Sequence, residues 1–135
     1  MIEASKYIST AKSYFNFLVI EFGFQLFKEK VRGNVFYDIQ YRDDTRIVSI
    51  SYENIEGYFQ VIVFVLKNGE LPEYDDKVNT LHLDKLNAKI LSNIDKSEIV
   101  LNGRYFEDFQ WHDEFEKKML KCAKELRLCL KHFKN

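Results

Sequence analysis

Polar side chains that could do chemistry alternate with apolar ones in two neighbouring stretches, VFYDIQYR and TRIVSISYE. They are a carboxylate, an amide and two hydroxyls: Asp38, Gln40, Ser49 and Ser51. In extended strands every second side chain lies on the same face, so all four would share one surface. Such a surface could bind a small molecule or support hydrolysis, could bind a protein, or could be the solvated face of a sheet.

The residue types that usually carry catalysis are few and scattered. The chain has no GxGxxG, GxxxxGK, GxSxG or HExxH motif, and His82, His112 and His132 lie far apart in sequence. Cys122 and Cys129 would lie about 10 Å apart along a helix, too far for a disulfide, so we expect two reduced core thiols, as in a cytoplasmic protein. We therefore predict no catalytic residue and no cofactor, and favour a binding protein over an enzyme.

Carboxylates are densest in the loop after Gly69, and a second acidic group starts the last helix. The loop carries Glu70, Glu73, Asp75 and Asp76 without the spacing of a calcium loop, which is typical of a solvated acidic loop. The second group is His112-Asp113-Glu114, and acidic residues favour the positive N-terminal end of a helix. We predict no metal site at either place.

Basic residues gather at the C-terminal end. Residues 117–135 carry six lysines and one arginine against Glu125 alone, which fits a solvated helix face that compensates the helix dipole. The alternative is a basic stripe for an acidic partner or a nucleic-acid backbone. Over the whole chain 20 Lys and Arg balance 21 Asp and Glu, which disfavours nucleic acid as the partner.

The elements that would position these residues begin with a helix. Apolar residues spaced by three, four and seven predict a single helix from Ala4 to Phe22, ended by Gly23. The period then changes to two. FQLFKEKV is expected to be an exposed edge strand before the Gly33-Asn34 turn, with a register ambiguous by one residue.

Two hairpins should follow. A tight turn at Asp43-Asp44 would place Asp38 opposite Ser49, Ile39 opposite Val48 and Tyr37 opposite Ile50. The next strand, YFQVIVFVLK, is apolar on both faces. The residues expected on the core face are Val35, Tyr37, Ile39, Tyr41, Val48, Ile50, Tyr52, Phe59, Val61, Val63 and Val65. The other face forms the candidate binding surface: Phe36, Asp38, Gln40, Ser49, Ser51, Tyr58, Gln60 and Phe64.

The last part of the chain is expected to be helical. A short helix is predicted around residues 83–91, and a heptad pattern predicts a long helix over residues 113–133. Between them, Ile99 to Leu101 could form a brief strand. The fold class is thus α+β: an N-terminal helix, an antiparallel meander of about four strands, a short helix and a long C-terminal helix.

Composition and length limit the number of domains and the kinds of partner that the chain can have. A chain of 135 residues with 46% hydrophobic and 30% charged residues predicts one globular domain over residues 1–135. No apolar run is long enough to span a membrane, so no membrane partner is expected. Most of the twelve Phe and eight Tyr must lie in the core, but so large a number favours an aromatic-lined pocket or contact surface as well.

The segment RIVSISYENIEGYFQVIVFVLKNG, preceded by LVIEFGF, resembles small uncharacterised bacterial α+β proteins, among them proposed immunity proteins of polymorphic toxin systems. The likeness covers roughly the first half of the chain and consists of folding patterns without active-site residues. It implies a cytoplasmic protein that binds and neutralises a cognate toxin.

The leading hypothesis is therefore a non-catalytic protein-binding module, including the immunity type, whose partner is another protein or a second copy of the chain. The first alternative is a small-molecule-binding or hydrolytic domain that uses the polar face of the sheet. The second is a nucleic-acid-binding protein that uses the basic C-terminal helix.

Overall fold

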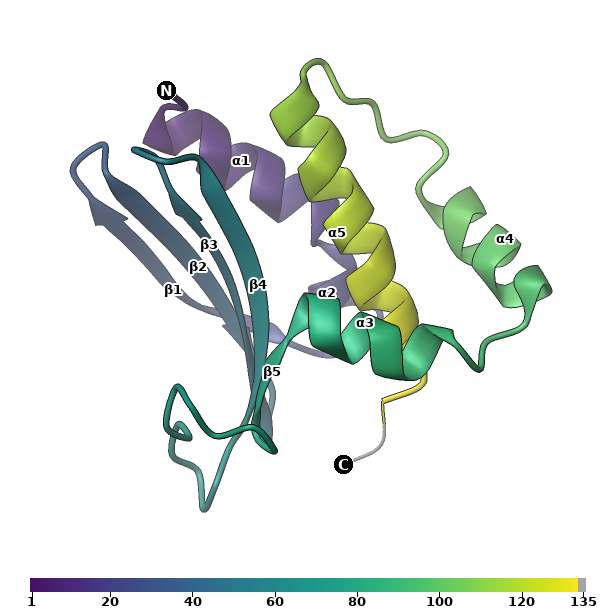
Figure 1. Cartoon of the computed structure of the whole chain (residues 1–135). Coiled ribbons are helices and arrows are strands. Elements are labelled where there is room, and N and C mark those ends of the chain that lie inside the picture. The colour runs from purple at the N-terminus through teal and green to yellow at the C-terminus, as the bar shows by residue number, and fades with distance from the viewer. Residues whose placement is uncertain (134–135) are drawn as a thin grey trace. The chain divides into compact units, whose positions relative to one another are not determined.

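The computed structural model describes residues 1–133 and shows an α+β protein with an antiparallel sheet, which confirms the predicted fold class (Figure 1). Packing divides the chain after His82 into two compact units. The first unit holds two helices and the sheet, and the second holds three helices. The expectation of a single domain stays a prediction.

The sheet is a meander in which each strand pairs with the next, in the order β1-β2-β3-β4-β5. Its strands are β1 (Gln25–Arg32), β2 (Phe36–Arg42), β3 (Arg46–Glu53), β4 (Tyr58–Val65) and β5 (Thr80–His82). The fifth strand had no sequence signal of its own, because three residues are too few to show a period of two.

The N-terminal helix is interrupted, contrary to the prediction of one helix from Ala4 to Phe22. It forms α1 (Ala4–Tyr14) and a short α2 (Phe17–Ile20). The residues at the break are buried almost without interruption: Tyr14, Phe15, Phe17 and Leu18. One regular helical face cannot bury so many adjacent side chains, and the break turns Phe15 and Phe17 inward together. Gly23 ends this region with a φ of 73°, as expected.

Helix α1 packs on β2 through a tyrosine cluster. The hydroxyl of Tyr7 donates a hydrogen bond to the backbone oxygen of Ile50 at 2.8 Å, and its ring contacts the rings of Tyr37 and Tyr52. These contacts define the helix-covered face of the sheet. The four residues predicted to anchor this core, Val48, Ile50, Val61 and Val63, are buried.

Val35 does not belong to this face. It lies in the turn between β1 and β2 with 38% of its surface exposed, so its prediction as a core-strand residue is wrong. Val35 is instead fixed by its backbone, whose oxygen accepts a hydrogen bond from the amide of Asn54 at 2.8 Å. The turn therefore ends, and β2 begins, one residue later than the alternation suggested.

The register of the hairpin formed by β2 and β3 differs from the prediction. Asp38, Ile39 and Tyr37 pair with Ser51, Ile50 and Tyr52 in place of Ser49, Val48 and Ile50. Because the difference is two residues along β3, every side chain keeps its predicted face.

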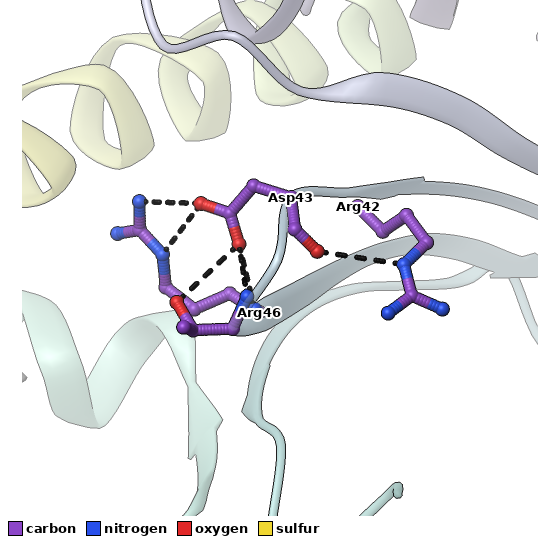
Figure 2. Close-up of polar contacts among 4 residues, drawn as sticks. Arg42, Asp43 and Arg46 are labelled. Atoms are coloured by element: carbon purple, nitrogen blue, oxygen red, sulfur yellow. Dashed lines mark hydrogen bonds and ion pairs between the residues drawn. The ribbon is translucent and has the colours of Figure 1, made fainter. Parts of the chain in front are cut away.

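The turn explains this shift, because it is centred on Asp44-Thr45 and not on Asp43-Asp44: the backbone amide of Asp43 donates to the backbone oxygen of Arg46 at 3.0 Å. The carboxylate of Asp43 accepts hydrogen bonds from the backbone amides of Thr45 (2.9 Å) and Arg46 (2.7 Å) and from the Arg46 guanidinium (2.8 Å). In Figure 2 the side chains of Arg42 and Arg46 extend in opposite directions from Asp43. Partial burial raises the pKa of Asp43, but these hydrogen bonds and the charge of Arg46 hold it below its ordinary value.

The second unit consists of α3 (Leu83–Leu91), α4 (Lys96–Tyr105) and α5 (Glu114–Lys131). The first and last were predicted, but Ile99 to Leu101 lie inside α4 and not in a strand. These three residues are exposed, so the β-branched side chains of Ile99 and Val100 were misleading. Asp113 caps α5 by accepting the backbone amide of Glu116 at 2.8 Å, as the acidic start of that helix suggested.

The heptad positions of α5 face inward only in part. Met119, Leu126 and Cys129 are buried, whereas Phe115 and Cys122 are half-buried. Neither cysteine is in a disulfide. Within residues 1–133, none of the helices has the length and apolar character needed to cross a membrane.

Candidate functional site: the outer face of the sheet

The face of the sheet turned away from α1 is called the outer face here. Strand pairing places all eight predicted site residues on it: Phe36, Asp38, Gln40, Ser49, Ser51, Tyr58, Gln60 and Phe64. They form rows across β2, β3 and β4, in which Asp38 pairs with Ser51 and Ser51 pairs with Gln60. The alternation of the sequence thus predicted the membership of this face, although the row-by-row pairing differs.

A hydrogen-bonded network occupies the middle of the outer face. The hydroxyl of Ser49 donates to one carboxylate oxygen of Asp38 at 2.6 Å, and the side-chain amide of Gln40 donates to the other at 2.7 Å. Both oxygens of Asp38 therefore accept hydrogen bonds within the sheet, which fixes the carboxylate in place.

This centre is less exposed than a half-solvated sheet face would be. Asp38 exposes 7% of its surface, and Ser49, Ser51 and Ile62 are also buried. Because so little of these side chains is exposed, the polar network is called the floor of the face. The residues around this floor must therefore supply the surface that a partner would contact.

Aromatic side chains border the floor near the β3–β4 turn. Tyr58 is 58% exposed and donates its hydroxyl to the side-chain oxygen of Gln60 at 2.9 Å. Phe36 lies in the row with Glu53 and Tyr58, and the guanidinium of Arg32 lies 5.7 Å from the centre of its ring. Tyrosine, phenylalanine and arginine are the side chains that protein interfaces favour.

A basic row on β1 lies directly beside Phe36 and the polar residues of β2. Lys28, Lys30 and Arg32 pair with Gln40, Asp38 and Phe36, and therefore share the outer face. All residues of β1 are exposed. The basic row consists of these three residues, and the sequence did not assign it to any face.

The reason is a bulge in β1. The pairing with β2 shifts between Leu26 and Lys28, so one extra residue, Phe27, interrupts the alternation. The ring of Phe27 is contacted by the cations of Lys28 and Arg42, at 5.3 and 5.1 Å from its centre. Arg42 thus extends the basic character of this edge toward the β2–β3 turn.

The opposite border of the outer face is formed by β5. Phe64 is half-buried and pairs with Thr80, while Ile62 pairs with His82. The ring of Tyr74, from the loop before β5, stands edge-on to the His82 ring at 5.4 Å. Phe64 consequently offers less contact area than its place in the sequence pattern suggested.

The acidic loop after Gly69 is organised by its own hydrogen bonds. The carboxylate of Asp76 accepts the backbone amides of Val78 (3.0 Å) and Asn79 (2.9 Å) and the side-chain amide of Asn79 (3.1 Å). The Asn79 side chain and these amides lower the pKa of Asp76. Among residues 1–133, no three His, Cys, Asp or Glu side chains lie close enough to hold a metal ion.

The outer face therefore has a fixed polar floor, an aromatic border and a basic edge. Comparison of the chain with protein families, curated proteins and solved structures finds no match.

Proposed function

We propose that this protein is a non-catalytic binding module that docks an acidic surface of another protein on the outer face of its sheet. The observation that carries the proposal is the basic row of Lys28, Lys30 and Arg32, in which Arg32 contacts the ring of Phe36. The exposed Tyr58 lies on β4 in the same row of the sheet as Phe36. Cations and aromatic rings at one surface can combine electrostatic attraction with apolar burial in the complex.

The polar floor supports binding over catalysis. The carboxylate of Asp38 already accepts hydrogen bonds from Ser49 and Gln40 of its own sheet and is 7% exposed, so little of it is open to a substrate. The same network links neighbouring side chains of the sheet and is already formed in the free protein. Binding of a partner therefore does not have to order these side chains. Preorganisation of this kind raises affinity by lowering the ordering penalty.

The charge of the outer face favours a different protein over a second copy of the chain. Each copy would bring the same three cations, Lys28, Lys30 and Arg32, to a shared interface. Repulsion between like charges opposes such a pairing, whereas carboxylates on a partner would be attracted.

The finer form of the proposal is an immunity-type protein of the cytoplasm that neutralises a toxin. It rests on the resemblance of residues 46–69 to proposed immunity proteins. A toxin gene beside this one, with a product that forms a stable complex with the chain, is the expected finding. If that product does not bind the purified chain, the immunity form fails while the binding module stands.

The test of the binding module compares two double variants with equal change in charge. Lys30→Glu with Arg32→Glu reverses the basic row, and Lys85→Glu with Lys96→Glu reverses two exposed lysines of the second unit. Tagged wild-type and variant chains are used to capture partners from the native cell, and the affinity of each purified partner is then measured. We expect one partner to bind the wild type and the control but to lose at least about tenfold in affinity for the basic-row variant.

A partner that binds the basic-row variant as tightly as the wild type would place the interface elsewhere. Each variant must first show a cooperative thermal transition near that of the wild type, so that loss of binding is not loss of fold.

A further inference from the structure

The second unit carries a hollow that the outer face does not involve. It has a volume of about 370 Å³ and lies along the first half of α5 and the segment before it. Its lining combines one buried apolar residue, one aromatic residue, one carboxylate and four lysines: Leu120, Trp111, Glu114, Lys117, Lys118, Lys121 and Lys124. We call it the lysine groove.

The lysines follow the helix at a regular spacing. Lys117, Lys121 and Lys124 are separated by four and three residues, so they lie on one side of α5 over roughly 10 Å. Lys121 meets Glu125 only at 4.0 Å, and its side chain is largely exposed. The lining holds four lysines and one carboxylate, so the groove has an excess of positive charge and its lysines repel one another unless an anion binds.

Trp111 supplies an apolar wall. It is 46% exposed, and the ammonium of Lys117 lies 5.0 Å from the centre of its ring. A partly exposed tryptophan beside a row of cations can receive an apolar side chain while the lysines receive carboxylates.

The far end of the groove is held rigidly by α4. The side-chain amide of Asn102 donates to the backbone oxygen of Lys124 at 2.9 Å, and Arg127 donates to the Asn102 oxygen at 2.8 Å. Arg127 is buried and stacks on Tyr105, so it serves the packing of the unit and is not part of the exposed basic surface. The basic stripe expected from the sequence is thus reduced to the lysines.

We propose that the lysine groove binds a short acidic segment of a protein, with an apolar side chain of that segment against Trp111. The regular spacing of the lysines matches carboxylates that repeat every three or four residues on a helical segment. This inference is independent of the proposed function of the outer face.

Nucleic acid fits the groove less well. Its cations are lysines only, although arginine is the usual residue for paired contacts with phosphate. The carboxylate of Glu114 lines the same hollow, where it could accept a hydrogen bond from a backbone amide of a peptide, a donor that a phosphate backbone lacks. The formal net charge of −1 also gives the chain little long-range attraction for a polyanion.

The chain's single tryptophan makes the groove directly observable. The probe is a short helical peptide rich in glutamate with one leucine, titrated into the full chain while the emission of Trp111 is recorded. The test variant is Lys118→Glu with Lys121→Glu, and the matched control is Lys85→Glu with Lys96→Glu, which changes the same net charge in the same unit. A single-stranded oligonucleotide of equal length is titrated in parallel.

We expect the peptide to shift the Trp111 emission, with affinity that falls as salt rises. The groove variant should bind at least about tenfold more weakly, and the control should remain within about twofold of the wild type. The proposal is overturned if the peptide leaves the emission unchanged, if both variants weaken binding equally, or if the oligonucleotide binds more tightly than the peptide. Because the outer face is untouched in every arm, failure here leaves the proposed function standing.

Discussion

The two faces of the sheet bury residues for different reasons. On the helix-covered face, Val48, Ile50 and Val63 are fully buried within a core of aliphatic and aromatic side chains. On the outer face, Asp38 and Ser49 are nearly as buried, but they are satisfied by hydrogen bonds to one another. One face is therefore held by apolar burial, and the other by a polar network whose border remains available for contact.

The largest effect should follow from a change to the helix-covered face. Val63→Ala should lower the free energy of unfolding by about 2 kcal/mol, through lost transfer energy and an unfilled cavity. Val63→Asp should abolish the cooperative thermal transition, because it buries an unpaired charge. Circular dichroism melts check both, and a cooperative melt of Val63→Asp would show that this face is not a core.

On the outer face the expected cost of a similar truncation is smaller. Ser49→Ala removes one donor from the buried carboxylate of Asp38 and should cost about 1–2 kcal/mol. Denaturant unfolding measures the difference. A cost within error of zero would mean that the network does not contribute to stability and that the outer face is held by packing alone.

The turn that joins β2 and β3 adds a dependence on pH. The folded-state pKa of Asp43 lies below its ordinary value of 3.8, so its stabilisation is present above that value and is lost as the pH falls through the folded pKa. Asp43→Asn should therefore flatten the acid side of the stability profile, measured as melting temperature against pH. An identical acid slope in the wild type and this variant would exclude Asp43 as its source.

The thiols of α5 should behave as buried groups. Burial, and then the charge of Glu125, raise the pKa of Cys129 to about 12. The same two causes raise the pKa of Cys122 to about 11, although Lys118 and Lys121 act to lower it. Labelling at neutral pH should be slow in the native protein and fast in denaturant, since the thiolate is the reactive form. Rapid stoichiometric labelling of either native thiol would reopen a catalytic function.

The smallest effect on stability is expected at the border of the outer face. Tyr58→Ala removes an exposed side chain and should change the free energy of unfolding by no more than about 0.5 kcal/mol, while it weakens partner binding. Thermal melts and binding measurements on the same sample separate the two effects. A large loss of stability with unchanged affinity would assign Tyr58 to the fold.

Which residues share a face could be predicted from the sequence, because a period of two survives a register shift of two. The residue that pairs with Asp38 could not be predicted, since the position of the turn depends on how the Asp43 side chain bonds to Thr45 and Arg46. The basic row was missed for a similar reason. A single bulged residue, Phe27, reverses the alternation in β1, and no composition signal marks where a bulge falls.

The break between α1 and α2, and the helix α4, show a second limit of predicting structure from the sequence pattern. Periodicity predicts a helix where apolar residues recur, but it does not tell whether one straight helix can bury Phe15 and Phe17 together. In α4 the exposed Ile99 and Val100 obscured a helix whose buried contact is the polar Asn102. Tertiary packing decided both elements against the local pattern.

The central claim is that the outer face, and not the helix-covered face, binds the partner. Adjacent residues of β1 test it directly: Lys30 pairs with Asp38 and lies on the outer face, while Glu29 pairs with Ile39 and forms an ion pair with Lys12 of α1. The measurement is the affinity of the purified partner for Lys30→Glu and for Glu29→Lys, by calorimetry at one salt concentration. The account predicts about tenfold weaker binding for Lys30→Glu and a change within about twofold for Glu29→Lys. Unchanged affinity for Lys30→Glu, or a loss confined to Glu29→Lys, would contradict it.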